Sequence, residues 1–82
     1  MTKSVHTRNY RLFLGLLIKA RKDAGVTQEQ LARRLNRPQS FVSKCENGER
    51  RLDVIELIQF LQSIGVEPIS FLRKIVQSTR IS

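Results

Sequence analysis

The chain has 82 residues, 40% of them hydrophobic and 27% charged, and its fifteen lysines and arginines against seven acidic residues give a formal net charge of +8. This composition excludes a fully disordered chain and is typical of a small domain with one modest core. The excess of positive charge favours a polyanionic partner such as nucleic acid.

Cys45 is the single cysteine, so the chain forms no internal disulfide, whereas small secreted domains usually carry several. No apolar run approaches the roughly 20 residues of a membrane span, and residues 1–11 are too polar for a signal peptide. We therefore expect a cytoplasmic protein without a membrane partner. The absence of repeats and linker-like segments predicts one domain over residues 9–76, with a flexible basic tail at 1–8 and a C-terminal tail at 77–82.

Apolar residues recur at spacings of three and four along the chain, which predicts an all-α fold with five helices. The first helix is expected at residues 9–24, before a stop at Gly25. Its predicted inner stripe consists of Phe13, Leu17, Ala20 and Ala24.

The second helix is expected to begin at Thr27 and to reach Leu35, because Thr27 and Gln30 have the spacing of a capping box. Asn36 and Arg37 then form a tight turn before a third helix at residues 39–47. Pro38 fits the first turn of that helix because it lacks only an amide that would be unpaired there.

Gly48 is expected to end the third helix, and Asp53 to cap a fourth with Glu56 as its reciprocal partner. Pro68 opens a fifth helix, which reaches Val76. The predicted inner stripe of the fourth helix consists of Val54, Leu57, Ile58, Leu61 and Ile64.

Two short helices joined by a turn of about four residues, at 27–35 and 39–47, have the geometry that places the second helix in the DNA major groove. The side of the second helix that points away from Val42 carries hydrogen-bonding side chains, of the types that read base edges. These are Gln39, Ser40, Ser43 and Lys44. Phe41 has two interpretations at this point: it contacts a thymine methyl group, or it packs over the turn.

The segments RKDAGVTQEQLA at 21–32 and SFVSKCENGE at 40–49, followed by residues 57–66, resemble the Cro/phage-repressor (Xre) helix-turn-helix family over about residues 13–72. The resemblance implies a compact, lambda-repressor-like five-helix bundle. It also implies a small transcriptional regulator that binds double-stranded DNA in the cytoplasm of a prokaryote or on behalf of a phage.

The resemblance also assigns roles by position. Base reading is implied for Gln39, Ser40, Ser43 and Lys44, with Phe41 beside them, and a salt bridge for Arg21 with Glu46. Contacts to the DNA backbone are expected from Thr27, Gln28, Arg37, Asn47, Arg50 and Arg51. Cys45 and the Asn36–Arg37 turn depart from the usual pattern of the family.

The sequence supplies no catalytic arrangement, because His6 and Cys45 have no partner that would activate either of them. It also lacks the ligand set of a zinc site and the glycine-rich loop of a nucleotide site. We therefore expect no enzymatic activity, no metal and no cofactor. Lys3, Arg8 and Arg11 form either a DNA-embracing arm or an ordinary tail.

Apolar residues beyond the needs of a five-helix core suggest a homodimer, which would bind a palindromic operator as a repressor or other regulator. The candidates for this interface are Leu14, Ile18, Ile55, Phe71 and Ile75. The alternatives are an antitoxin-like module with a protein partner and a restriction-modification controller that regulates its own operon.

Overall fold

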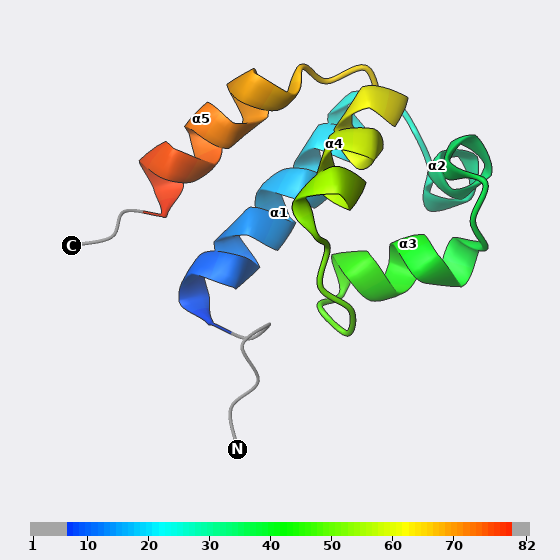
Figure 1. The fold of residues 1–82 in the computed structure, drawn as a ribbon, viewed down its shortest axis with the longest axis horizontal. Helices are drawn as coiled ribbons and strands as arrows, with labels where there is room; N and C mark the ends of the chain where they lie inside the picture. Colours follow the sequence, from blue (N-terminus) through cyan, green and yellow to red (C-terminus); the bar gives the residue numbers. More distant parts are fainter. Residues whose placement is uncertain (1–6, 80–82) are drawn as a thin grey trace.

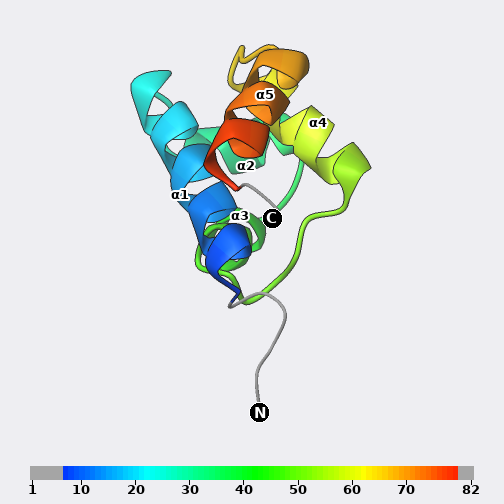
Figure 2. The same cartoon turned by 90° about the vertical axis from the view of Figure 1, so that its left-hand side faces the viewer.

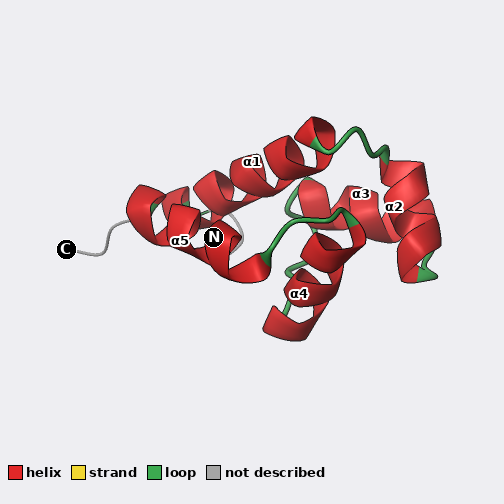
Figure 3. Cartoon of the chain, turned by 90° about the horizontal axis from the view of Figure 1, so that it is seen from above, coloured by secondary structure: helices red, strands yellow, loops and turns green. Residues whose placement is uncertain are grey.

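The computed structural model describes residues 7–79, and within them the chain forms helices only. The five helices are α1 (Arg8–Asp23), α2 (Gln28–Leu35), α3 (Gln39–Glu46), α4 (Val54–Ser63) and α5 (Pro68–Ser78). Helices α2 and α3 lie at one end of the long axis, and α5 lies beside α1 towards the other (Figures 1 and 3). The all-α, five-helix prediction is therefore confirmed.

Local hydrogen bonds fix where the second and fourth helices begin. The Thr27 hydroxyl accepts from the Gln30 amide at 3.0 Å, while the Gln30 side chain accepts from the Thr27 amide at 2.9 Å. Asp53 and Glu56 form the same reciprocal pair, at 2.7 and 3.0 Å. Both capping boxes were predicted from spacing alone. Pro38 differs by one position, since it is the N-cap of α3 rather than its first helical residue.

Left-handed residues end α1, α2 and α4. Gly25, Asn36 and Gly65 have φ values of 73°, 58° and 76°. The amide after each of them donates to a carbonyl five residues back, for example Arg37 to Ala32 at 2.9 Å. This is the Schellman arrangement, which closes a helix and reverses the chain. The helices therefore stay short and fold back on one another.

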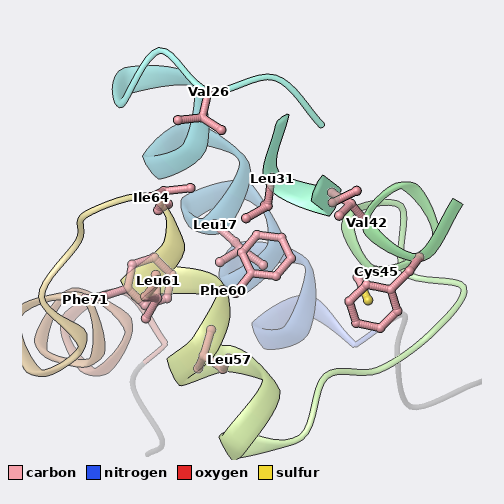
Figure 4. Close-up of a cluster of buried hydrophobic side chains, with 12 residues drawn as sticks. Leu17, Val26, Leu31, Val42, Cys45, Leu57, Phe60, Leu61, Ile64 and Phe71 are labelled. Carbon is pink, nitrogen blue, oxygen red and sulfur yellow. The ribbon is translucent and has the colours of Figure 1, made fainter. Parts of the chain in front are cut away.

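The core lies where α1, α2, α3 and α4 meet. Its largest fully buried side chains are Phe60, Leu17, Leu31, Leu61, Val42 and Cys45. Figure 4 shows the Phe60 ring with Leu17 and Leu31 close to it and with Val42 and Cys45 on the neighbouring helix. Outside this core, Arg34 of α2 donates to the Ser63 carbonyl at 2.8 Å and ties α2 to α4. Helix α3 thus packs mainly against α2 and also against α1, while α2 is tied to α4.

Several predicted burial assignments were wrong. Leu14 and Phe71 are only 7% and 3% exposed, so both belong to the core rather than to a free surface. Phe71 packs edge-on against Phe13, with 6.2 Å between ring centroids, which explains its burial. Val54, in contrast, is exposed and does not belong to the inner stripe of α4, and Ala24 is exposed at the end of α1.

The helices also extend further than predicted at both ends of the domain. Arg8 already belongs to α1, which Thr7 caps by accepting from the Tyr10 amide at 3.2 Å. Gln77 and Ser78 belong to α5, although a tail was expected from residue 77. The remaining tail predictions, with Lys3 and His6, lie outside the described residues.

Helices α4 and α5 form a bent pair, with 117° between them. Within residues 7–79, no single helix is long and apolar enough to cross a membrane, and only this pair taken together meets that test. Figure 2 shows the two helices diverging, with α1 on the other side of α5. Phe60 and Leu61 of α4 and Phe71 of α5 are among the buried residues of the core.

Candidate nucleic-acid interface

Helix α3 has one face in the core and one face towards solvent. Phe41, Val42, Cys45 and Glu46 are buried, and this side holds the helix against the bundle. On the opposite side Gln39, Ser40 and Lys44 are exposed and Ser43 is half-buried. All four predicted base-reading side chains other than Phe41 therefore lie on or beside one accessible polar surface.

A buried ion pair borders this surface on the side of α1 and α2. The Arg21 guanidinium donates to both oxygens of Glu46, through Nε at 2.6 Å and Nη2 at 3.0 Å, and through Nη1 to the Val26 carbonyl at 2.8 Å. Gln28, at the start of α2, donates its side-chain amide to Glu46 at 2.9 Å. Glu46 thus joins the first three helices beside the exposed face of α3.

An open hollow of about 360 Å³ lies next to this ion pair. Its lining includes Gln28, Ser43 and Asn47, which are three of the predicted DNA-contacting residues. Gln28 is the first residue of α2, whose N-terminus favours negative charge, and Arg21, Lys22 and Glu46 also line the hollow. The hollow therefore lies between the start of α2 and the exposed face of α3.

Two arginines border the other side of α3. Arg37 follows the turn after α2 and Arg50 follows α3, and both guanidiniums stack on the Phe41 ring, at 4.1 and 4.9 Å from its centroid. Arg50 forms a bidentate pair with Glu56 of α4, at 3.0 and 2.8 Å, and Arg37 lies 3.6 Å from the same carboxylate. We call these four residues, Arg37, Phe41, Arg50 and Glu56, the arginine cluster.

Within the arginine cluster, Arg50 and Glu56 each stabilise the charged form of the other. Hydrogen bonds from Arg50 hold the pKa of the Glu56 carboxyl below its ordinary value, against the opposing effect of burial. The same hydrogen bonds raise the pKa of Arg50. Glu56 is therefore ionised at neutral pH, and the cluster carries two positive charges against one negative charge.

The segment after α3 is anchored to α1 through an aromatic residue. The Leu52 amide donates to the Tyr10 hydroxyl at 3.3 Å, and the Arg51 guanidinium stacks on the Tyr10 ring at 4.3 Å. Asn47 and Glu49 bond to each other through both side chain and backbone, at 2.7 and 3.0 Å. Asn47, Arg50 and Arg51 are thereby held near the exposed face of α3.

Comparison with known proteins assigns the family of this chain. The profile of the helix-turn-helix family matches residues 17–71, which include α2, α3 and α4. The chain belongs to the Xre-type helix-turn-helix family. Among solved structures it is similar to an XRE-family like protein from Pseudomonas syringae pv. tomato str. DC3000, with 53% identity over 93% of each chain and a TM-score of 0.85. None of the curated proteins matches it.

The family assignment makes this chain a DNA-binding helix-turn-helix regulator. The structure explains two features of the sequence, the residue at the turn and the role of Phe41. Asn36 adopts the left-handed conformation at the turn, which Asn tolerates better than other residues with a Cβ atom. Phe41, only 8% exposed, packs beneath Arg37 and Arg50, so the structure favours the packing interpretation over base contact.

Cys45 of this Xre-type domain is fully buried, as a small core residue would be. Burial raises the pKa of its thiol, an effect that the neighbouring Arg50 guanidinium only partly offsets. A thiol with a raised pKa forms little thiolate at neutral pH and reacts slowly. Within residues 7–79, no three His, Cys, Asp or Glu side chains are grouped so as to hold a metal ion.

Sequence reasoning missed two residues that shape the site. Glu56 was explained as a cap, and its long-range pairing with Arg37 and Arg50 carries no local signal. Tyr10 lies outside the predicted inner stripe of the first helix, and no sequence pattern gave it a role. An acidic residue in an otherwise basic region was the available clue for Glu56, but only its distance from each arginine reveals the cluster.

The predicted interface residues are divided between the core and the surface. Leu14 and Phe71 lie in the core, Ile18 and Ile75 are half-buried, and Ile55 is exposed. Three further apolar side chains of α5 are exposed at the spacing of one helical stripe, namely Ile69, Leu72 and Val76. We call these three residues the α5 stripe.

Proposed function

We propose that this protein is a sequence-specific transcriptional regulator, without enzymatic activity, that occupies a palindromic operator as a homodimer and represses transcription in the cytoplasm. The observation that carries the proposal is the exposed polar face of α3, bordered on one side by the Glu46 ion pair and on the other by the arginine cluster. Such a face fits the major groove, where each base pair presents a distinct pattern of donors and acceptors.

The proposed contacts divide into two kinds. Gln39, Ser40, Ser43 and Lys44 would contact base edges, and Gln and Lys suit adenine and guanine respectively. Contacts to phosphates would hold the protein in register and supply most of the affinity. The phosphate contacts proposed are Thr27, Gln28, Arg37, Asn47, Arg50 and Arg51, all of which lie around α3 or at the start of α2.

Homodimerisation is proposed through the α5 stripe, supplemented by Ile55 and by the half-buried Ile18 and Ile75. Recognition helices that read successive major grooves lie about 34 Å apart, so each lies about 17 Å from the two-fold axis. The chain is 38 Å long along its longest axis, with α5 towards one end and α3 towards the other (Figure 1). A two-fold axis beside α5 is therefore compatible with this spacing.

The proposal is tested by selecting bound sequences from a random pool of duplexes with the full chain. We expect one enriched, palindromic sequence. Lys44→Ala should then weaken binding to that sequence by roughly 5- to 150-fold, because one good base contact contributes about 1–3 kcal/mol of discrimination. Its effect on a scrambled duplex should be several-fold smaller.

Lys19→Ala is the matched control, because Lys19 is an exposed lysine of α1 that pairs with Asp23. It removes the same charge and should weaken binding to both duplexes slightly and equally. Equal losses on both duplexes for Lys44→Ala would show that α3 does not read bases. Failure to enrich any sequence would contradict the proposal and favour a protein-interaction module of the antitoxin kind.

A further inference from the structure

We propose that Glu56, a residue of α4 outside the helix-turn-helix, is a positioning residue that sets the specificity of DNA binding by holding Arg37 and Arg50 at one edge of α3. This inference rests on the proposed function, because it assigns a role to an acidic residue within the same DNA-binding surface. A carboxylate there repels phosphates, and a neutral Gln would serve the capping box equally well, so the negative charge of Glu56 needs a further explanation.

The geometry joins two arginines that are distant in sequence. Arg50 reaches Glu56 with two nitrogens at 3.0 and 2.8 Å, and Arg37 approaches the same carboxylate at 3.6 Å. Both guanidiniums also lie over the Phe41 ring, whose electron-rich face attracts cations. The Glu56 carboxylate and the Phe41 ring together offset the repulsion between the two guanidiniums, so both can lie at the same edge of α3.

Glu56 is itself held rigidly. It is the third helical residue of α4, and its Oε1 atom accepts from the Asp53 amide at 3.0 Å in the capping box. Its side chain is 15% exposed, whereas the Arg37 and Arg50 side chains are 45% and 41% exposed. The anchor is thus mostly covered, while the two arginines that it holds remain accessible to a phosphate.

Holding the arginines in advance affects operator and random DNA differently. A long, flexible side chain loses conformational freedom when it is fixed at an interface, and prior fixation by Glu56 removes part of that cost. This saving in conformational entropy is realised only when α3 lies in its correct register on the operator. Only in that register do two DNA phosphates lie where the two guanidiniums are held. On random DNA the negative charge of Glu56 simply weakens the attraction.

Glu56→Gln separates positioning from charge. Gln at the third helical position still accepts from the N-cap amide, so the capping box and the start of α4 are kept. The variant removes the negative charge and one of the two acceptor oxygens that hold Arg50. Glu67→Gln is the matched control, because it makes the same charge change at the N-cap of α5, away from α2 and α3 (Figure 1).

The measurement is the dissociation constant of the full-length protein for its selected operator and for a scrambled duplex at one salt concentration. We expect Glu67→Gln to tighten both equally and leave their ratio unchanged. Glu56→Gln should lower the operator-to-random ratio by about tenfold, with random binding tightened and operator binding not. An unchanged ratio in Glu56→Gln would overturn the proposal, because it would reduce Glu56 to a cap and a background charge.

A second variant tests the route through the arginines. In a chain carrying Arg37→Gln at an exposed position and Arg50→Gln at a half-buried one, adding Glu56→Gln should change the ratio less than twofold. A tenfold loss in that background would also overturn the proposal. If the wild-type protein shows no preference for the operator over random DNA, the proposed function fails. If the wild type shows that preference and Lys44→Ala abolishes it, but Glu56→Gln leaves the ratio unchanged, only this inference fails.

Discussion

The buried guanidinium of Arg21 shows how single residues hold the recognition helix in place. It directs three nitrogens to Glu46 and to the Val26 carbonyl, so its charge and its hydrogen-bonding capacity are both satisfied. Among the described residues, no buried side-chain nitrogen or oxygen lacks a partner. The energetic consequence is asymmetric, because an intact buried pair contributes little while a broken one is costly.

Glu46→Gln should therefore lower the free energy of unfolding by about 3 kcal/mol, since Arg21 would be left buried without its counter-charge. Urea denaturation followed by circular dichroism measures this change. Asp23→Asn is the control, because it removes a carboxylate from the exposed Lys19–Asp23 pair and should cost less than about 1 kcal/mol. A loss below 1 kcal/mol in Glu46→Gln would contradict the argument that Arg21 is left buried with an uncompensated charge.

Asn36 is a second residue whose backbone conformation matters more than its contacts. Its side chain is exposed and its φ of 58° is left-handed. Asn36→Ala should lower the free energy of unfolding by about 1 kcal/mol, because alanine tolerates the left-handed backbone conformation less well than asparagine does. Asn36→Gly should cost less, since glycine has no such penalty. Thermal unfolding of the three proteins compares them, and equal melting temperatures for Asn and Ala would contradict the strain argument.

At the scale of the helices, the sequence predicts local features well. Both capping boxes, the helix stops at Gly25 and Gly48 and all five helices follow from residues within one turn of each other, and the structure contains them. Burial was less predictable for α1 and α5, because apolar residues on several sides of α1 define no single stripe. Leu14, assigned to the surface, lies against Gly48 after α3, a contact between segments more than 30 residues apart.

The candidate site also has a part that the sequence predicts and a part that it does not. The polar face of α3 follows from helical periodicity once Val42 is placed in the core, and the Glu46 ion pair follows from the family resemblance. The arginine cluster does not, because Arg37, Phe41, Arg50 and Glu56 come from four different segments. Only the packing of α4 against the turn after α2 brings them together.

The N-cap of α5 gives this helix a pH dependence. Hydrogen bonds from Ser70 and Ile69 hold the pKa of the Glu67 carboxyl below its ordinary value of 4.5. A carboxyl whose pKa is lower in the folded state stabilises it above the unfolded pKa, and this contribution is lost as the pH falls through the folded pKa. Between pH 6 and 3.5 the wild type should thus lose more stability than Glu67→Gln, as measured by urea midpoints. Parallel losses would contradict the role of Glu67 as a charged cap.

At the scale of the whole molecule, the proposed DNA-binding surface and the exposed apolar surface occupy different regions. Lys44 belongs to α3 and the arginine cluster lies at its edge, whereas α5, which carries the α5 stripe, lies beside α1 and away from α3 (Figure 3). Val76 is the most exposed member of the stripe, at 70%, so replacing it removes no core contact. A change there reports on association between chains rather than on the stability of one chain.

Val76→Lys should therefore leave the melting temperature of the isolated chain nearly unchanged. It should weaken self-association by tenfold or more, because the introduced ammonium group must lose its water at the interface and is repelled by the same group of the second chain. Sedimentation measures the association, and binding to full and half operators shows its consequence: the preference for the full palindrome should fall. Gln77→Lys adds the same charge at a neighbouring exposed position and should alter neither. If the wild type sediments as a monomer both free and on DNA, or if both variants behave alike, the dimer does not form through α5.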